Sequence, residues 1–304
     1  MQPFDLEEVS FVSEGLRCAA TLYRPRSAEV RQVAVPGVVM GPGFASVRQM
    51  NLPDCAAVLA SAGLAVLTVD YRYLGQSQGE PRQQVRPREQ REDLRNALTW
   101  LADAPGIDPD RMGLWGTSFA AGHVLQVAAL DRRVKAVVSQ VPGLGLWPYL
   151  RGQGDGPARE DLLNRLLADR LARHRTGVSR RLPIVARDGI ESVLGSSGVD
   201  WHDAAERAHP TFHNEILMSS LNDVVDEDPA AFAPFITPTP LLMIVAERDN
   251  IAPPGLAYAA FEAAGQPKRL LTYDGDHYDV YDVPATLRLV STAARDFYLE
   301  HFSH

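Results

Sequence analysis

The chain has 304 residues, of which 45% are hydrophobic and 22% charged, and its formal net charge is −8. This length and composition are typical of one globular domain, or of one domain carrying a sizeable insertion, with an ordinary packed core. The negative charge argues against a nucleic-acid-binding protein, which needs a basic face, and no apolar run approaches the ~20 residues of a membrane-spanning helix.

Apolar runs and apolar residues at helical spacing alternate along the chain. The runs predict strands at residues 6–12, 17–23, 36–40, 64–70, 112–116, 134–140, 241–246 and 269–273. Helical spacing predicts helices over residues 55–62, 94–101 and 287–297. The first of these helices has Asn51 as its predicted N-cap and Pro53 in its first turn.

This order of elements predicts an α/β fold. A mostly parallel central sheet would be flanked by helices, and its first two strands would form an antiparallel hairpin around residues 13–15. In sheets of this kind, functional sites form in loops at the carboxyl ends of the strands.

The alternation stops between about residues 145 and 235. This stretch contains an amphipathic segment at 161–174 and scattered aromatic residues, Trp147, Tyr149, Trp201 and Phe212. It is too long for a structureless loop of a compact domain. We therefore predict a helical cap at residues 145–235, inserted into a core formed by residues 1–144 and 236–304.

A serine follows the strand predicted at 112–116. Small residues, Gly116 and Ala120, stand two positions before and after Ser118, and a helical pattern follows. A tight strand-to-helix turn needs small residues at both positions, and it raises the serine hydroxyl above the sheet edge, as a nucleophile requires. Alone, the pattern is weak, because a serine that caps a helix produces the same spacing.

Two later loops supply the partners that a serine nucleophile needs. An imidazole must accept the hydroxyl proton, and a carboxylate must hold that imidazole in the correct tautomer. Asp249 lies three residues after the strand at 241–246, and His277 lies four residues after the strand at 269–273. We therefore predict Ser118 as nucleophile, His277 as base and Asp249 as acid. Glu247 and Asp276 are the alternative carboxylates.

The intermediate of such a reaction also needs backbone N–H groups that bind its oxyanion. We expect one from Phe119, directly after the predicted nucleophile. The other is expected from Phe44, in a Gly-Pro-Gly-Phe loop that follows a buried strand. An ordinary turn would have the same Gly-Pro-Gly sequence.

Together these residues resemble the α/β-hydrolase superfamily. The similarity is greatest to the branch of dienelactone-hydrolase-like serine esterases and fungal polyketide acyltransferases. It is carried by GPGF at 41–44, VDYRYLGQSQGEPR at 69–82, DPDRMGLWGTSFAAGH at 110–123, AERDNIAPP at 246–254 and GDHYD at 275–279. The resemblance implies serine-dependent acyl transfer without a cofactor and a substrate pocket between sheet and cap.

Two departures from the family pattern leave the catalytic groups in place. Pro42-Gly43 stands where many relatives have His-Gly, and Ala120 stands where the usual motif has glycine. Dienelactone hydrolases themselves use a cysteine nucleophile, so Ser118 indicates a different activity. We expect no metal and no organic cofactor.

Several functions are compatible with these residues. The leading one is hydrolysis of a carboxylic ester, lactone or thioester of a small organic substrate through an acyl-enzyme. The alternatives are transfer of a polyketide-type acyl group to an alcohol or amine, carbon–carbon bond hydrolysis by the same residues, and a ligand receptor that has kept only the fold. The intact serine, acid and histidine argue against a receptor.

The predicted cap is rich in arginine. Nine arginines lie between Arg151 and Arg187, whereas the whole chain has two lysines. Such a surface would suit an acidic acyl-carrier protein or a phosphate-bearing thioester. A solvated helix with ion pairs such as Asp161 with Arg165 is the simpler interpretation.

The cysteines and the N-terminus give further expectations. Cys18 and Cys55 lack the spacing of a metal site, so we expect both to be reduced and structural. The N-terminus shows no basic segment followed by an apolar one, as a secretory signal would, so we expect a cytoplasmic protein.

Overall fold

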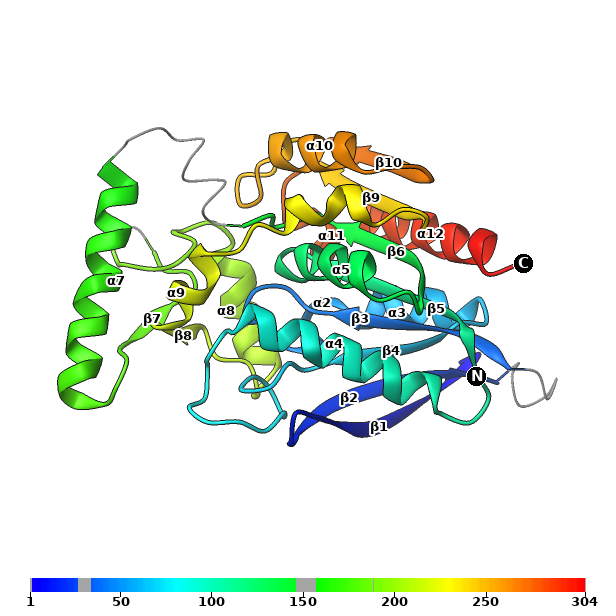
Figure 1. The fold of residues 1–304 in the computed structure, drawn as a ribbon, viewed down its shortest axis with the longest axis horizontal. Coiled ribbons are helices and arrows are strands. Elements are labelled where there is room, and N and C mark those ends of the chain that lie inside the picture. The colour runs from blue at the N-terminus through cyan, green and yellow to red at the C-terminus, as the bar shows by residue number, and fades with distance from the viewer. Residues whose placement is uncertain (1, 27–33, 146–156, 188, 304) are drawn as a thin grey trace.

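The computed structural model describes residues 2–26, 34–145, 157–187 and 189–303. Its centre is an eight-stranded sheet in the order β1-β2-β4-β3-β5-β6-β9-β10 (Figure 1). The strands are β1 (Phe4–Ser13), β2 (Leu16–Pro25), β3 (Val35–Gly41), β4 (Ala65–Val69), β5 (Ile107–Thr117), β6 (Val134–Gln140), β9 (Leu241–Ala246) and β10 (Lys268–Tyr273). The antiparallel contacts are β1 with β2 and β2 with β4, and the other pairs are parallel, so the predicted α/β fold is confirmed.

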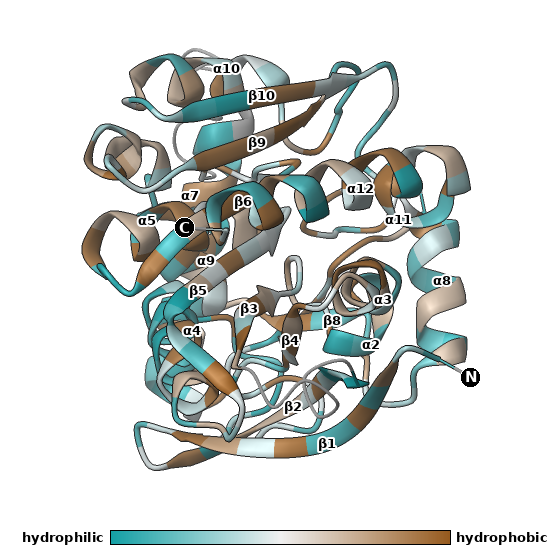
Figure 2. Ribbon diagram, turned by 90° about the vertical axis from the view of Figure 1, so that its right-hand side faces the viewer, coloured by the Kyte–Doolittle hydropathy of each residue, from teal (hydrophilic) through white to brown (hydrophobic). Residues whose placement is uncertain are grey.

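The buried strands have apolar side chains on both faces because successive residues point to opposite sides of the sheet. In β3, Val39 packs into one core cluster while Val38 and Met40 pack into the other. The first face is covered by α4 (Pro87–Ala102), α5 (Phe119–Leu130) and α10 (Pro254–Ala263), and the second by α3 (Pro53–Ser61) and α12 (Pro284–His301) (Figure 2).

The start of α3 differs from its prediction. Asn51 is the last residue of a short additional helix, α2 (Arg48–Asn51), and Leu52 is the N-cap residue of α3. The cause is Asp70, whose buried carboxylate accepts a hydrogen bond of 2.7 Å from the backbone N–H of Arg48. A carboxylate at this end of a helix stabilises it, and nothing local in the sequence of α2 indicates such a distant partner.

A smaller group of elements lies between β6 and β9, at the left in Figure 1. It contains α7 (Pro157–Thr176), β7 (Arg181–Pro183), α8 (Val199–Ala208), β8 (Glu215–Leu217) and α9 (Ser220–Val225). The predicted pair of Asp161 with Arg165 forms in α7, with an Nε–Oδ2 distance of 2.9 Å. Strands β7 and β8 are too short to show a periodic pattern, and the sequence did not predict them.

These elements share a core that reaches the main sheet. Phe212 and Ile216 of the insertion pack in one cluster with Ala45, Val47 and Val85 from loops after β3 and β4. The 3-10 helix η1 (Pro229–Phe235) instead packs against α5 and α10. The exact bounds of the cap at 145–235 stay a prediction, and Trp147 and Tyr149 lie outside the described residues.

The cysteines and the helices show two further properties. Cys18 and Cys55 are both free and buried. None of the helices in the described part of the chain is long and apolar enough to cross a bilayer.

Candidate active site

Ser118 lies at the sharp turn from β5 into α5. Its φ of 55° is in the left-handed region, where a residue other than glycine is strained. The turn is closed by Gly116, because a Cβ at this position would overlap the carbonyl group of Ala120. Ala120 itself keeps its methyl group and is fully buried. The turn therefore requires glycine two positions before Ser118, whereas it accommodates alanine two positions after it.

The three side chains predicted as nucleophile, base and acid meet at the carboxyl end of the sheet. The Oγ of Ser118 lies 2.9 Å from Nε2 of His277, and Nδ1 of His277 lies 2.7 Å from Oδ2 of Asp249. His277 and Asp249 are both buried, whereas Ser118 is partly exposed. His277 therefore directs one ring nitrogen to the hydroxyl of Ser118 and the other to the carboxylate of Asp249.

Asp249 is fixed by its own loop. Its second oxygen, Oδ1, accepts hydrogen bonds from the backbone N–H groups of Ile251 at 2.9 Å and Ala252 at 2.7 Å. These bonds leave Oδ2 for His277. A carboxylate held by two backbone donors keeps one orientation, as a residue that orients an imidazole requires.

The alternative carboxylates are directed elsewhere. Glu247 is exposed at the end of β9. The Oδ1 atom of Asp276 accepts a hydrogen bond from the backbone N–H of Tyr278, 2.9 Å away. His277 makes its carboxylate contact with Asp249 instead.

The loop after β3 packs directly against Ser118. A Cβ built on Gly43 would be 3.3 Å from the Cβ of Ser118, so glycine permits this close approach. The rings of Phe44 and Phe119 meet edge to face, with centroids 5.2 Å apart. Within the described residues, the backbone N–H groups of Phe44 and Phe119 donate no hydrogen bond to the protein. Phe44 and Phe119 both line the cavity at Ser118, and their role as oxyanion donors stays a prediction.

A buried ion pair holds this loop in place, and sequence reasoning missed it. The guanidinium of Arg48 pairs with the carboxylate of Asp70, and the two side chains are 2% and 0% exposed. Asp70 also accepts a hydrogen bond from the backbone N–H of Gln76 at 3.0 Å. Burial raises the pKa of Asp70, although Arg48 opposes the shift. The sequence signal was a single acidic residue at the end of an apolar strand.

His123 lies in α5, one turn beyond Ser118. Its Nε2 atom is 3.0 Å from the side-chain oxygen of Gln90, and its ring packs edge-on against Phe119. Burial lowers the pKa of His123 well below its usual value, so its ring is neutral near pH 7. It supports the residue that follows Ser118 and does not contact the reacting hydroxyl.

A cavity of about 130 Å³ opens above Ser118. Its wall is formed by aliphatic, aromatic, proline and glycine residues: Phe44, Phe119, Pro142, Gly143, Leu144, Gly145, Val193, Leu194, Leu221, Val224, Ile251, Ala252, Pro253 and Leu256. Among these described residues none carries a charge. The cavity therefore favours an uncharged, apolar group beside the serine hydroxyl.

Residues 197–202 of the insertion contact both loops that carry the acid and the base. Trp201 packs against Tyr278 and Tyr281, with centroid distances of 5.4 Å to each. Gly198 has a φ of +73°, and a Cβ there would overlap the ring of Tyr278. The hydroxyl of Ser197 donates to the side-chain oxygen of Asn250, 3.3 Å away. The sequence showed Trp201 only as an aromatic residue of the cap.

Comparison with known proteins identifies the chain. The family model of X-Pro dipeptidyl-peptidase (S15 family) matches residues 14–279. The chain belongs to the peptidase S15 family of α/β-hydrolases. The serine, aspartate and histidine described above all lie within the matched range.

Individual relatives cover nearly the whole chain. The quorum-quenching protein AidA of Acinetobacter baumannii (strain MDR-ZJ06) is 30% identical over 93% of this chain and 91% of its own. The thiohydrolase aneE of Aspergillus aculeatus is 27% identical over 89% of this chain and 86% of its own. The polyketide transferase grgF of a Penicillium species is 29% identical over 77% of this chain and 78% of its own.

The relative GrgF also has a crystal structure. That structure, described as an α/β-hydrolase, superimposes with a TM-score of 0.83 over 99% of this chain and 100% of its own, at 27% identity. The fold and the relatives together show an enzyme of the α/β-hydrolase type, either a hydrolase or an acyltransferase. The resemblance to fungal polyketide acyltransferases is confirmed at the level of the superfamily.

Binding of a metal ion requires several coordinating side chains that lie close together. Within the ranges that the structure describes, histidine, cysteine and acidic side chains form no cluster of three or more that could hold a metal ion.

Proposed function

We propose that this S15-family member is a serine hydrolase that cleaves a carboxylic ester, lactone or thioester with an apolar acyl group. The observation that carries the proposal is the hydrogen-bonded series from Ser118 through His277 to Asp249, at 2.9 and 2.7 Å, beneath a cavity whose described lining residues carry no charge. These distances are those at which a base accepts a proton from a nucleophile.

In the proposed first step, the Oγ of Ser118 attacks the acyl carbonyl carbon while its proton moves to Nε2 of His277. Asp249 stabilises the imidazolium that forms and keeps the ring oriented. The carbonyl oxygen becomes an oxyanion, which the backbone N–H groups of Phe44 and Phe119 bind. His277 then returns the proton to the leaving alcohol or thiol as the tetrahedral intermediate collapses to an acyl-enzyme.

In the second step, His277 takes a proton from water, and the resulting hydroxide attacks the acyl-enzyme. The same two N–H groups hold the second oxyanion. Collapse releases the carboxylic acid, and Ser118 recovers its proton from His277. Substrate, water and products balance without a cofactor.

The lack of charged side chains among the described residues of the Ser118 cavity argues against a dipeptidyl-peptidase activity. Such an enzyme must hold the free ammonium group of a peptide N-terminus, and a buried ammonium needs an anionic or strongly hydrogen-bonding partner. The described residues around the Ser118 cavity offer aliphatic and aromatic side chains instead. An acyl chain without a charge fits that wall better.

Acyl transfer is the second candidate. It is favoured by the likeness to GrgF, a polyketide transferase, and it uses the same residues until the acyl-enzyme forms. An alcohol or amine would then replace water. The apolar wall supports this alternative because it limits the access of water to the acyl-enzyme.

A fluorophosphonate probe and a substrate panel test the proposal. We expect the probe to label the wild-type protein at Ser118, and p-nitrophenyl esters and acyl thioesters of apolar acids to release free acid. Adding alcohols or amines and following products by mass spectrometry separates hydrolysis from transfer. A folded protein that is not labelled at Ser118 and does not act on any member of the panel would contradict both candidates.

A further inference from the structure

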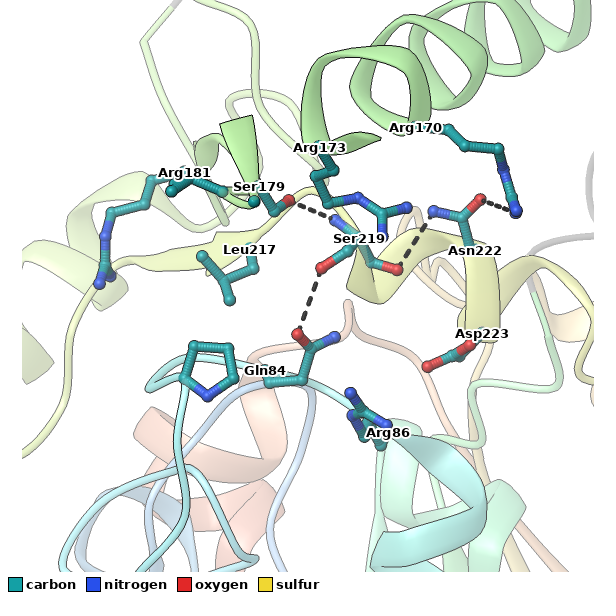
Figure 3. A pocket seen from close by; sticks show the side chains of 13 residues that line it. Gln84, Arg86, Arg170, Arg173, Ser179, Arg181, Leu217, Ser219, Asn222 and Asp223 are labelled. Atoms are coloured by element: carbon teal, nitrogen blue, oxygen red, sulfur yellow. Dashed lines mark hydrogen bonds between the residues drawn. The ribbon is translucent and has the colours of Figure 1, made fainter. Parts of the chain in front are cut away.

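A second cavity, of about 540 Å³, lies on the opposite side of α9 from the Ser118 cavity. Asn222 and Asp223 of this helix line the second cavity, whereas Leu221 and Val224 line the first. Most residues of the second cavity's wall have polar side chains, and four of them are arginines, Arg86, Arg170, Arg173 and Arg181 (Figure 3). One short helix therefore separates an apolar cavity at the nucleophile from an arginine cavity.

The floor of the arginine cavity is a hydrogen-bonded frame. The hydroxyl of Ser219 donates to Gln84 at 3.2 Å, and its backbone N–H donates to the hydroxyl of Ser179 at 2.9 Å (Figure 3). The amide of Asn222 donates to the carbonyl oxygen of Ser219 at 3.2 Å. These polar groups bind each other, so the shape of the floor is fixed by the protein itself.

Two arginines of α7 carry donors that the protein leaves unused. Arg173 donates through Nε to the buried carboxylate of Asp169 at 2.7 Å, and neither of its terminal NH2 groups has a partner among the described residues. Arg170 donates to Asn222 at 3.2 Å and pairs with no carboxylate in the described ranges. Because they are three residues apart on one helix, their side chains project from the same face.

The other charges around the cavity limit its electrostatic field. Arg86 pairs with Glu89 at 3.2 Å, and Arg181 pairs with Glu215. Asp223 faces the cavity as well, and burial raises the pKa of its carboxyl group. Because these acidic side chains offset much of the positive charge around the cavity, the affinity for an anion must come from direct hydrogen bonds to Arg170 and Arg173.

We propose that this cavity binds a phosphate monoester group, held between the guanidinium groups of Arg170 and Arg173. A phosphate monoester has three terminal oxygens and up to two negative charges, so it can bind two guanidinium groups at once, whereas the two oxygens of a carboxylate match the fork of a single arginine. The phosphate has two possible sources, a substrate carrier arm or a separate phosphorylated effector. The first source rests on the proposed function, because it requires a thioester whose acyl end reaches Ser118 while its phosphate end lies across α9.

Binding is tested first, without catalysis. The probes are 4′-phosphopantetheine and pantetheine, which differ by the phosphate alone, titrated calorimetrically into the full chain. We expect the phosphorylated probe to bind at least about tenfold more tightly, since hydrogen bonds to charged groups contribute this much or more. Arg170→Gln together with Arg173→Gln should abolish the difference, and Asp223→Asn should increase it.

Arg175→Gln is the matched control. Arg175 lies on the same helix, is exposed, and is not part of the cavity wall, so its replacement removes one positive charge from α7, as each substitution of the double variant does, without removing a ligand. Equal binding of the two probes by the wild type would overturn the proposal. So would an equal loss in the control and in the double variant. Should the double variant fail to fold, Arg170→Gln alone replaces it, because Arg170 has only the bond to Asn222 to lose.

Kinetics then identify the source of the phosphate. The two substrates are the same acyl group on 4′-phosphopantetheine and on pantetheine. A preference in kcat/KM for the phosphorylated substrate that disappears in the double variant indicates a carrier arm. Phosphate-dependent binding with equal kcat/KM for the two substrates indicates a separate effector and still supports the site. Absence of turnover and of fluorophosphonate labelling in the wild type contradicts the proposed function while leaving the binding result valid.

Discussion

The indole ring of Trp201 packs against the ring of Tyr278, with 5.4 Å between their centroids. Tyr278 directly follows His277, and its own ring lies 5.4 Å from the imidazole. Its hydroxyl donates to the carbonyl oxygen of Ser197, 3.3 Å away. An element inserted between two sheet strands is thus in van der Waals contact with the residue beside the proposed base.

Replacing Ser118 or His277 by alanine should abolish turnover. Either change removes the atom that the proposed acyl-enzyme requires, and loss of one member of such a set has lowered kcat about a millionfold in another serine hydrolase. Ester hydrolysis is measured alongside far-ultraviolet circular dichroism, which should show unchanged folding. Turnover near the wild-type rate in either folded variant would exclude the mechanism.

Asp249→Asn should preserve the fold and lower kcat about ten-thousandfold. The amide is nearly isosteric and its oxygen can still accept from Ile251 and Ala252, but its NH2 group then faces Nδ1 of His277 and favours the wrong tautomer. Glu247→Gln is the control, since Glu247 is exposed. If the Glu247 variant lost the activity and the Asp249 variant kept it, the assignment of the acid would be wrong.

Gly116→Ala and Ala120→Gly each change one methyl group, but the first should destabilise the protein much more than the second. Gly116→Ala places a Cβ against the carbonyl of Ala120, so we expect a loss of about 3 kcal/mol or more in the free energy of unfolding. Ala120→Gly restores the usual family residue and should cost only about 1 kcal/mol, the cost of glycine within a helix. Urea unfolding and esterase activity check both. An active, stable Gly116→Ala variant would show that the turn tolerates a side chain.

Much of this site was predictable because its residues are specified locally. Ser118, Asp249 and His277 each lie two to four residues after an apolar run, and parallel strands bring their carboxyl ends to one edge of a sheet. No distance had to be known to expect them together. The Gly-Pro-Gly-Phe loop was predictable for the same reason.

The contacts that the sequence did not reveal all join distant segments. Arg48 pairs with Asp70 across 22 positions, and Trp201 meets Tyr281 across 80. Neither contact leaves a periodic pattern, because each depends on how the short helix α2 or the inserted helix α8 is docked. The positions of Arg170 and Arg173 beside a cavity likewise depend on the packing of α7 against α9, which composition alone did not specify.

Acid should weaken the protein through His123. Its pKa in the folded chain is well below the usual 6.5, so below about pH 6.5 the unfolded chain binds a proton that the folded chain excludes. The free energy of unfolding should therefore decrease as the pH is lowered below about 6.5, by up to about 1.4 kcal/mol per pH unit for this one group. Burial also lowers the pKa of His202, which adds to the effect in the same direction.

His123→Gln isolates this contribution. Glutamine retains a polar group near Gln90 but has no proton to gain, so the difference in stability between wild type and variant should shrink as pH falls from 7 to 5. His174→Gln, at an exposed position of α7, is the control for removing a histidine. A pH dependence that is the same in the wild type and the His123 variant would contradict the assignment.

Trp201→Ala should lower kcat without removing a reacting group. The ring supports Tyr278 and Tyr281, which flank His277, and a displacement of about 1 Å at a catalytic group can cost about a hundredfold in rate. We expect a fall of about tenfold to a hundredfold in kcat, together with slower labelling by the fluorophosphonate probe. Trp201→Phe keeps an aromatic ring at this position and should retain most of the activity.

The matched control for this variant is Arg207→Gln, an exposed residue on the same helix. Thermal unfolding of all three variants separates a displaced base from an unfolded cap, because the rate should fall at temperatures where Trp201→Ala is still folded. The pH–rate profile gives an independent readout. A change in the position of His277 alters its hydrogen bond to Asp249 and should move the profile, whereas a purely structural role would leave it where it is. A Trp201→Ala variant with wild-type kcat and an unchanged profile would show that α8 does not position the base.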